Sequence, residues 1–556
     1  MKCKTGVGMF GMRSSPAVVG DNTQQRLCWF WHYRGRPTKA KKHLIIFCLV
    51  FVCLWGQAQK HDYNWMTGYF SSLGYDSNYQ HWFGISRFDF NQQPVVIQRD
   101  SVNMTFDFTN ATISDASGNL LFSSNGVRIH NAFDEKIVDS LANLGDTSYF
   151  YYLCPDCFST GQRYNQYQII LPSPQNINEY DIFYTYIDSI NIPAGITLGV
   201  KKILQASIEV NTNGSFNLKK RDFEVLNEKL SLVIAATKHA NGKDWWIITN
   251  HEASNIYSLL HYDGSGNFNT PFPQQGGGST EQGGLISLRF SPEGSFFASA
   301  STNVDSVNIF SFDRCSGTLS LLEQLIIPEL KDSFQWWPTA IEFSPNGRFL
   351  YIFCSFRIFQ FDLQATPIQS SRQSIGVFNP THRVPFSQTF FNAQLAPDGK
   401  IYVSSGNTNY GVGIIDNPNG QGASCNFNDT ALNLPTFISG VPYYPNYRLG
   451  PLSGSPCDTI SNLNETERAA KEKQVKVFPN PATDFVTVDY GFTDWSKKGE
   501  VSMEIANELG QVVYAQVLPQ YSGFQKMNIA DFVGGFYTVY IRRGNLVIAA
   551  SKFTKQ

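Results

Sequence analysis

The chain has 556 residues and a formal net charge of −2, from 43 Lys and Arg against 45 Asp and Glu. This length predicts two or three domains with a large buried core, and the near-neutral balance excludes the basic surface that nucleic-acid binding needs. Charged residues make up 16% of the chain and aromatic residues 14%. That composition favours an extracellular all-β protein, because strands favour aromatic and β-branched side chains.

A secretion signal is predicted near the start of the chain. Basic residues precede an unbroken apolar run, Leu44–Trp55, and the small residues Gly56 and Ala58 follow it. Cleavage is therefore expected between Ala58 and Gln59. A transmembrane anchor is the alternative, but this run is short for a bilayer. We assign residues 1–58 to an N-terminal extension and signal peptide, and expect no permanent transmembrane segment.

Six cysteines follow the predicted cleavage site, and an even number in an oxidising location favours disulfides. Their spacing does not determine the pairing. Cys154 and Cys157 also have the spacing of a redox pair or of half a zinc site, but neither a strand–helix context nor a second pair accompanies them. A local disulfide is the favoured interpretation. The candidate disulfide cysteines are Cys154, Cys157, Cys315, Cys354, Cys425 and Cys457.

The middle of the chain contains a repeat of about fifty residues. Four turns end at Gly242, Gly294, Gly347 and Gly399, which are separated by 52, 53 and 52 residues. Three of these turns have Pro at their second position, and Pro and Gly in this order suit a type I turn. Short apolar segments precede and follow the turns, so each repeat predicts three or four short strands.

A repeat of this size and content is typical of a β-propeller blade. One such sheet cannot bury both faces alone, so successive sheets are expected to stack around an axis. Looser repeats at Gly118 and near residue 179 bring the number of turns to six. A seventh blade is expected to combine Asp62–Phe90 with Cys425–Leu452 and so close the ring, although six or eight blades remain possible. The predicted propeller spans residues 59–457.

Two further regions complete the chain. Residues 458–474 are polar and are predicted to be a linker. Residues 475–556 show the alternation of about seven short strands, enough for a small β-sandwich. The predicted fold is therefore all-β, with a propeller of about seven blades followed by a small C-terminal sandwich.

The C-terminal region resembles the type A C-terminal sorting domain of the type IX secretion system. The residues that carry this resemblance are Phe478, Pro479, Asn480, Pro481, Gly510, Gly535 and Tyr537. It implies export across the outer membrane, followed by secretion or anchoring at the cell surface. It also implies as partners the secretion machinery and its processing and anchoring enzyme. An ordinary immunoglobulin-like adhesion module is the alternative.

Other segments are similar to those of large secreted bacterial proteins that join a propeller-like region to this tail. They include His81-Trp82-Phe83-Gly84, Phe312–Leu319 and Asn446–Pro451, and they extend the resemblance over roughly residues 60–556. The resemblance supplies no activity that can be assigned to particular residues. A weaker similarity of Phe343–Tyr351 to lactonase-type propellers consists mostly of ordinary turn and strand residues.

No linear motif indicates catalysis, metal binding or a cofactor. His251-Glu252 begins like a zinc-protease helix, but Asn255 occupies the place of the second histidine. His251 and His261 are therefore interpreted as ordinary strand or loop residues. Asp263–Asn267 is favoured as a hairpin turn over a calcium loop, because it has no later bidentate Glu. We assign no catalytic, cofactor-binding or metal-binding residues and expect no cofactor.

Two tryptophan pairs, Trp245-Trp246 and Trp336-Trp337, are the strongest candidates for binding elements. Exposed at a propeller mouth, they could stack on sugar rings. The favoured interpretation is that they fill the space between blades, since neighbouring residues of a strand point to opposite faces.

Three functional hypotheses remain. The leading one is a secreted or surface-bound propeller without catalysis, which binds a glycan or a protein through loops at one end. The alternative is an extracellular enzyme, such as a lactonase, lyase or glycan hydrolase, with a site at the propeller channel. A durable spacer is the third, since one fold hosts many functions. Acidic groups or histidines that converge at the channel with shifted pKa values favour an enzyme, and a neutral lining counts against it.

Overall fold

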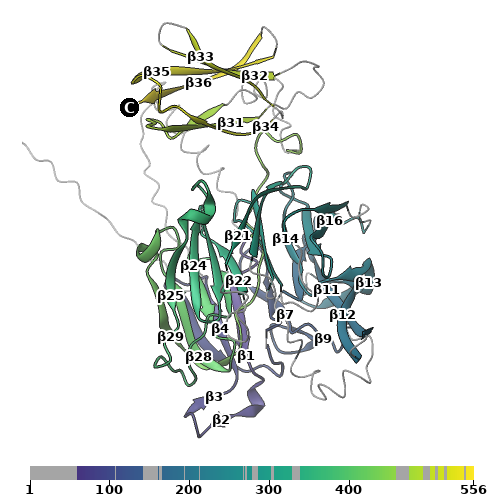
Figure 1. Ribbon diagram of the computed structural model, residues 1–556. Coiled ribbons are helices and arrows are strands. Elements are labelled where there is room, and N and C mark those ends of the chain that lie inside the picture. The colour runs from purple at the N-terminus through teal and green to yellow at the C-terminus, as the bar shows by residue number, and fades with distance from the viewer. Residues whose placement is uncertain are drawn as a thin grey trace, which may run out of the picture. The chain divides into compact units, whose positions relative to one another are not determined.

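The computed structural model describes residues 59–106, 108–141, 161, 166–192, 195–211, 213–266, 268, 272–278, 286–301, 306–327, 338–458, 475–491, 501–507, 511–518, 522–543 and 546–556. Within these ranges the regular elements are β-strands and three short 3-10 turns (Figure 1). None of the elements described is a helix long and apolar enough to cross a membrane. The predicted signal through Ala58, the Cys154 and Cys157 pair, Trp336-Trp337, Gly510 and most of the linker lie outside the described residues.

Seven antiparallel sheets follow one another between residues 64 and 438 of the described chain, as predicted. The first has three strands and the other six have four, in chain order. Their strands are β1 (Asn64–Gly68), β4 (Ile85–Asp89), β5 (Val96–Asp100); β6 (Ala111–Ser114), β7 (Leu120–Ser124), β8 (Ile129–Asn131), β9 (Lys136–Val138); β10 (Gln168–Pro172), β11 (Glu179–Ile192), β12 (Gly195–Val210), β13 (Phe216–Leu230); β14 (Ala235–Lys238), β15 (Trp245–Asn250), β16 (Ile256–Tyr262), β17 (Phe272–Gln275). The remaining ones are β18 (Ile286–Phe290), β19 (Phe296–Ser301), β20 (Ser306–Asp313), β21 (Thr318–Ile326); β22 (Pro338–Phe343), β23 (Phe349–Cys354), β24 (Arg357–Asp362), β25 (Gln373–Val377); β26 (Asn392–Leu395), β27 (Ile401–Ser404), β28 (Asn409–Ile415) and β29 (Phe427–Ile438).

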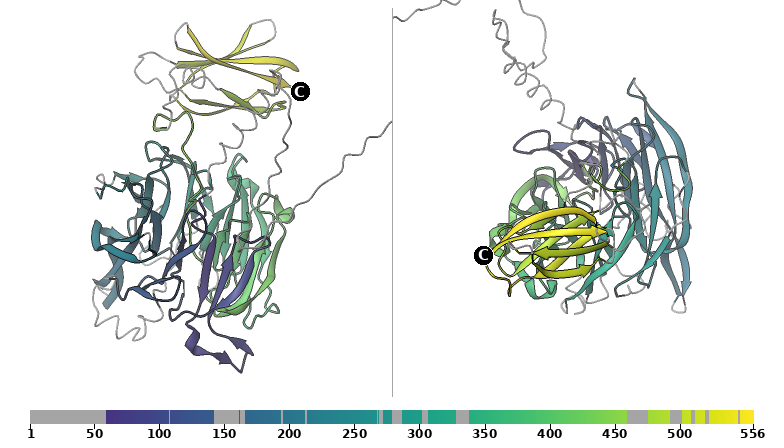
Figure 2. Two further views of the ribbon diagram at one scale, coloured as in Figure 1. Left: turned by 180° about the vertical axis from the view of Figure 1, so that it is seen from behind. Right: turned by 90° about the horizontal axis from the view of Figure 1, so that it is seen from above.

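Consecutive sheets are in contact all the way around the ring. Contacts of β1 with β6, β6 with β10, β14 with β18, β18 with β22, and β22 with β26 link the first strands of neighbouring sheets. The third and fourth sheets are joined by the N–H of Ile234, which donates to the carbonyl of Gln166 at 2.9 Å. The last strand, β29, contacts β4 and β5 of the first sheet. Strands β11, β12 and β13, with 14, 16 and 15 residues, are longer than those of the other sheets (Figure 2).

The four repeated turns occupy equivalent places, each between the first and second strand of its sheet. Gly242, Gly294, Gly347 and Gly399 all have positive φ, between 70° and 81°. The N–H of Gly294 donates to the carbonyl of Ser291 at 2.8 Å, which closes the turn. The hydroxyl of Ser291 accepts the N–H of Phe296 at 3.0 Å and so fixes the start of the next strand. The Ser-Pro-x-Gly sequence is therefore a turn that also sets the register of the strand pair.

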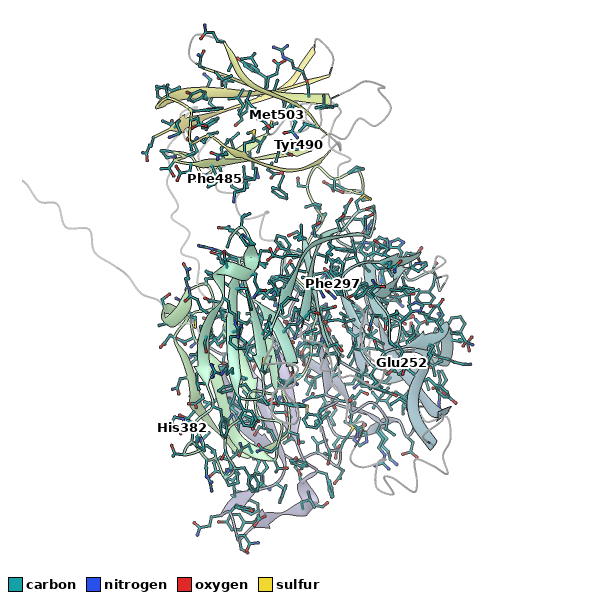
Figure 3. The ribbon with its side chains drawn as sticks, in the orientation of Figure 1. Glu252, Phe297, His382, Phe485, Tyr490 and Met503 are labelled. Carbon is teal, nitrogen blue, oxygen red and sulfur yellow. A yellow bond between two sulfur atoms is a disulfide. The ribbon has the colours of Figure 1, made fainter. Side chains whose placement is uncertain are left out.

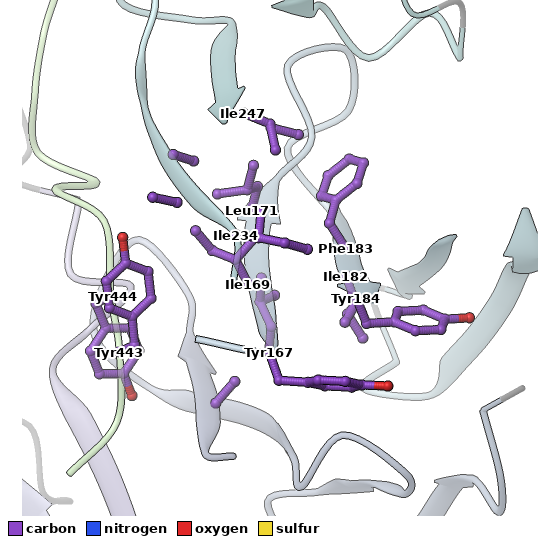
Figure 4. Close-up of a cluster of buried hydrophobic side chains, with 14 of the residues drawn as sticks. Tyr167, Ile169, Leu171, Ile182, Phe183, Tyr184, Ile234, Ile247, Tyr443 and Tyr444 are labelled. Atoms are coloured by element: carbon purple, nitrogen blue, oxygen red, sulfur yellow. The ribbon is translucent and has the colours of Figure 1, made fainter. Parts of the chain in front are cut away.

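The central strands are buried on both faces because each sheet packs between two others. All six residues of β15 and all six of β23 are buried. Trp245 and Trp246 lie in this core: the indole of Trp246 donates to the carbonyl of Arg314 at 2.7 Å. The packing interpretation of this pair is confirmed. Figure 4 shows another part of the same core, where residues of β10 and β11 meet Ile234 and Ile247.

The ring closes where residues from its two ends meet, as predicted. The prediction that residues after Cys425 supply strands to the first sheet is wrong, because they form the fourth strand of the last sheet. Phe427–Ile438 forms β29, which pairs with β28 in the last four-stranded sheet. β29 contacts the first sheet without joining its ladder, and the following residues, Ser439–Gly450, which we call the central segment, also lie beside β1. The hydroxyl of Thr67 donates to the carbonyl of Gly440, and the Tyr444 hydroxyl donates to the carbonyl of Asn64 at 3.2 Å. Side chains, and not a regular ladder, therefore hold this junction.

Among the four candidate disulfide cysteines that the structure describes, two are joined in a disulfide and two are not. Cys315 and Cys457 form a disulfide with a Cα–Cα distance of 5.6 Å. Cys354 and Cys425 are buried thiols that belong to two different hydrophobic clusters. Each fills its site as a small apolar side chain, so the disulfides predicted for Cys354 and Cys425 are not formed.

The described part of residues 475–556 forms the predicted sandwich of seven strands in two sheets. Its strands are β30 (Lys476–Phe478), β31 (Phe485–Gly491), β32 (Val501–Ala506), β33 (Val512–Val517), β34 (Ser522–Asn528), β35 (Gly535–Arg543) and β36 (Leu546–Lys555). Figure 3 shows Met503 and Tyr490 between the two sheets, where both belong to a hydrophobic cluster made only of residues from this domain. The sandwich therefore has a core of its own.

Candidate functional site

The centre of the ring is occupied by the central segment. Tyr447 donates its hydroxyl proton to the carbonyl of Ile170 on β10 at 2.7 Å, and its ring packs edge-on against Trp245. Asn446 donates to the carbonyl of Pro292, after β18, at 2.7 Å. The segment also contacts two further inner strands. The Tyr444 hydroxyl is hydrogen-bonded to the Thr112 hydroxyl on β6, and the Asn392 side chain on β26 donates to the carbonyl of Val441. The segment thus contacts sheets on several sides of the axis.

A pocket of about 240 Å³ lies beside the central segment, at the end of the ring that carries the repeated turns. Turn residues of three sheets contribute Pro292, Pro345 and Pro397 to its lining. Its charged lining residues are Asp62, Arg289, Glu342 and Arg448. Two carboxylates, those of Asp62 and Glu342, therefore converge here, as the enzyme hypothesis requires. Whether either could act as a catalytic acid or base depends on its ion-pair and hydrogen-bond partners.

Glu342 is fully engaged with Arg289. The two side chains are 3.2 Å apart, and the carboxylate also accepts the N–H groups of Phe343 and Leu395 at 3.0 and 2.9 Å. The guanidinium of Arg289 donates to the backbone carbonyls of Ile341 on β22, Ala393 on β26 and Tyr444 in the central segment. Burial raises the pKa of Glu342, and Arg289 opposes this shift. This pair joins β18, β22 and β26 to the central segment.

The second carboxylate, Asp62, is paired in the same way. Arg448 donates to it at 2.5 Å, so the residue preceding β1 is tied to the central segment. Each carboxylate of the pocket thus has an arginine partner. Neither offers the unpaired carboxyl group, within reach of a ligand, that general acid–base catalysis uses.

A second cluster of titratable groups lies at the turn between β14 and β15. His239, Asp244 and His261 place one nitrogen or oxygen atom each within 4.8 Å of one another. The Nδ1 atom of His239 accepts the N–H of Asn241 at 3.1 Å, and its Nε2 faces the carbonyl of Cys315 at 3.2 Å. Both ring nitrogens are thereby used, and the tautomer is set with the proton on Nε2. No lone pair of His239 is then directed at a metal.

The other histidine considered from the sequence, His251, lies at the far end of the β15–β16 pair. Its Nε2 is 3.0 Å from Glu228 and 2.8 Å from the hydroxyl of Ser258. His261 pairs across from Trp246 and is 3.2 Å from Asp244. The structure therefore places the two histidines in different local networks, His261 on β16 and His251 after the end of β15.

At the opposite end of the ring, a hairpin of two short strands, β2 (Tyr75–Asp76) and β3 (His81–Trp82), extends from the first sheet between β1 and β4 (Figure 1). Its base is Gly68 and Gly84, both with positive φ. A Cβ on Gly68 would lie 2.3 Å from the carbonyl oxygen of Gly84. The close approach of these two backbones therefore requires glycine.

Exposed rings gather on this hairpin and its neighbours. We call Tyr75, Tyr79, Trp82, Arg99 and Phe386 the hairpin surface. Tyr75 and Trp82 pair across the two strands with ring centres 4.9 Å apart, and the guanidinium of Arg99 lies 4.1 Å from the Trp82 ring. Tyr79 packs edge-on against Phe386 at 5.2 Å. Sequence reasoning did not select these residues as a site, although six aromatic residues lie among polar turn residues from Tyr69 to Phe83.

The residues of the predicted sorting motif form internal contacts of the sandwich. Asn480 accepts the N–H of Thr554 at 3.0 Å and donates to the carbonyl of Lys552 at 3.2 Å. This side chain joins the loop of Phe478, Pro479 and Pro481 to the last strand. Tyr537 stacks on Phe553 with ring centres 5.4 Å apart, and Gly535 begins β35 with a φ of 157°. A role of these residues in sorting remains a prediction.

Comparison with known proteins identifies the C-terminal domain. Residues 476–556 match the family described as the secretion system C-terminal sorting domain. The chain thus carries a type IX secretion sorting domain, and it is exported across the outer membrane to the cell surface or the extracellular space. No curated protein sequence matches the chain.

Several solved structures are similar to this chain at low sequence identity. A protein from Lactobacillus plantarum has a TM-score of 0.39 and 11% identity, over 68% of this chain and 99% of its own. A putative 6-phosphogluconolactonase from Bacteroides fragilis has a TM-score of 0.39 and 10% identity, over 68% and 98%. PorZ, a surface component of the type IX secretion system of Porphyromonas gingivalis, has a TM-score of 0.21 and 10% identity, over 85% and 79%. At these TM-scores no activity is transferred to this chain.

Proposed function

We propose that this exported propeller is a non-catalytic binding or adhesion protein that recognises a glycan or a protein through the end of the ring bearing the β2–β3 hairpin. The observation that supports this function is the occupation of the ring's centre by the central segment. A propeller enzyme collects its catalytic groups around the axis. Here tyrosine side chains of the central segment fill that space, and Tyr443, Tyr444 and Tyr447 are buried.

The alternative, an extracellular enzyme acting at the channel, depends on the pocket beside the central segment. Asp62 and Glu342 give that pocket two carboxylates, but Arg448 and Arg289 neutralise them. Breaking such a buried pair leaves one charge uncompensated, which typically costs about 3–5 kcal/mol. We therefore interpret these two ion pairs as contacts that stabilise the packing of the central segment against the sheets. Recognition is assigned to the outer loops.

Binding and turnover are compared on one preparation of the mature, full-length protein. Retention is measured on immobilised glycans, neutral and anionic, and on outer-surface proteins of neighbouring cells, while the soluble phase is analysed for hydrolysis or elimination products. We expect retention on at least one of these surfaces without product.

The control variant is Glu342→Gln, which keeps the shape of the side chain at the pocket. Retention should be the same for this variant wherever it is folded, because the proposed binding end lies elsewhere. Product formation by the wild type that disappears in a folded Glu342→Gln variant would establish the enzyme instead. If the protein is retained on none of these surfaces, the proposed function is wrong.

A further inference from the structure

We propose that the hairpin surface is a carbohydrate-binding site, and that its ligand is a neutral polysaccharide or oligosaccharide. This inference rests on the proposed function, because it names the ligand class for the same end of the ring.

The rings of the hairpin surface are exposed and also held in place. Tyr75 is 49% exposed, Tyr79 and Trp82 are each 43% exposed, and Phe386 is 39% exposed. Each of them contacts a second ring edge-on, and Arg99 covers one face of Trp82. A ring that is already braced loses little rotational freedom when a ligand stacks on it, which reduces the entropic cost of binding.

Ring contacts with β28 and β29 fix the hairpin to the last sheet of the ring. His81 stacks on Tyr410 with ring centres 4.0 Å apart and an interplanar angle of 25°, and Phe83 packs against Phe437 at 4.9 Å. The turn is closed by Asp76, whose carboxylate accepts the N–H groups of Asn78 and Tyr79. The exposed rings are therefore carried by an anchored element and not by a loose loop.

The charge of this surface suits an uncharged ligand. Between Tyr69 and Gly84 the only acidic or basic residue apart from His81 is Asp76, and burial lowers the pKa of His81, which keeps it neutral near pH 7. With Arg99 included, the formal charges cancel. Asp76 and Arg99 together carry no excess charge that would attract an anionic polymer. Ser77, Asn78 and Gln80 are exposed polar residues beside the rings and can exchange hydrogen bonds with sugar hydroxyls.

The area of the rings favours a sugar over a protein. An aromatic side chain has roughly 200 Å² to bury, so the exposed fractions of the four rings leave about 350 Å² together. A stable protein–protein interface needs about 800 Å² on each partner. A pyranose ring presents an apolar C–H face with hydroxyls around its edge, and it needs only one aromatic face and a few polar neighbours. This matches separate rings in a polar surface.

The test is affinity electrophoresis of the mature, full-length protein in gels that contain laminarin, mannan, xylan, dextran or starch, with alginate and heparin as anionic polymers. The variants are Trp82→Ala and Tyr79→Ala. Phe133→Ala is the matched control, because Phe133 is 84% exposed and lies outside the hairpin surface, in the turn between β8 and β9. Thermal unfolding confirms that the variants are folded.

We expect retardation by at least one of the neutral polymers. Loss of one stacking ring should weaken that binding about tenfold, while Phe133→Ala stays within about twofold of the wild type and Trp82→Phe retains part of the affinity. Retardation by alginate or heparin alone, or equal retardation of Trp82→Ala and wild type, would overturn the inference.

Two outcomes separate this inference from the proposed function. If no polysaccharide binds, but retention on neighbour-cell proteins is lost in Trp82→Ala and Tyr79→Ala, the carbohydrate ligand is wrong and the binding end is right. If neither variant changes any retention, both the ligand class and the binding end are wrong.

Discussion

Lys238 is a buried cation whose surroundings predict a pH effect. It lies on β14, with its ammonium group 3.9 Å from the centre of the Trp245 ring and 3.2 Å from the carbonyl of Lys243. Burial lowers the pKa of Lys238 to about 7 from an ordinary value of 10.5, although Asp244 opposes the shift. The residues named lie within seven positions of Lys238, but the sequence alone does not show that the fold buries both Lys238 and Trp245.

The shift predicts that the propeller becomes more stable as the pH rises above neutrality. Between pH 7 and pH 10.5 the unfolded chain binds this proton and the folded chain does not, so the free energy of unfolding increases with pH across that window. We expect a gain of about 2 kcal/mol between about pH 7 and pH 9, measured by denaturant unfolding.

The matched variant is Lys238→Met, which keeps an unbranched side chain without a charge. It should lose the rise with pH and should be more stable than the wild type at pH 7, because no charge is dehydrated. An equal slope in both proteins would assign the pH dependence to other groups.

At the scale of elements, the repeated turns show what a local sequence signal can predict. Gly294 and Gly399 both have positive φ, of 75° and 81°, as their turns require. Their surroundings differ. A Cβ on Gly294 would lie 2.8 Å from the side chain of Arg314 and 3.0 Å from that of Leu449, whereas one on Gly399 meets nothing within 4 Å. The sequence predicts the backbone conformation, and only the fold reveals the crowding.

We therefore expect Gly399→Ala to lower the free energy of unfolding by about 1 kcal/mol, the cost of placing a Cβ at positive φ. Gly294→Ala should cost about 2 kcal/mol or more, because Arg314 and Leu449 must also move. Equal losses in the two variants, measured by denaturant unfolding, would show that the neighbours of Gly294 yield without cost.

The elements that the sequence did not predict are those outside the repeat. The spacing of the turns predicted six of the seven sheets, because each of these six has a turn between its first and second strands. The β2–β3 hairpin and the central segment occur once each, so no period marks them. The distinction between Cys315, which pairs with Cys457, and Cys354, which remains a thiol, depends on which strands meet in space. Spacing along the chain contains none of that information.

At the scale of the whole molecule, the propeller and the sandwich have separate hydrophobic cores. Deletion of Val475–Gln556 should therefore leave the propeller folded. The deleted protein should accumulate in the periplasm, because the sorting domain is the part that the type IX machinery recognises. Cell fractionation and thermal unfolding of the periplasmic form test this expectation, and normal surface display of the deleted protein would contradict it.

The disulfide between Cys315 and Cys457 closes a loop with a sequence separation of 142 residues and follows directly after the central segment. Its loss in Cys457→Ser should lower the stability of the propeller by about 2–4 kcal/mol. Reductant should destabilise the wild type by a similar amount and leave Cys457→Ser unchanged, as measured by denaturant unfolding. Wild-type protein with the same midpoint in the presence and absence of reductant would contradict this role.

This disulfide fixes the residues that follow the central segment to the sheet that contains β20 and β21. Because disulfides form in oxidising compartments and not in the cytoplasm, we expect this disulfide to form in the periplasm, before the protein crosses the outer membrane. The secretion machinery would then transport a propeller that is already folded. If the chain were cleaved after Asp458, the disulfide would still hold the new C-terminus of the propeller in place.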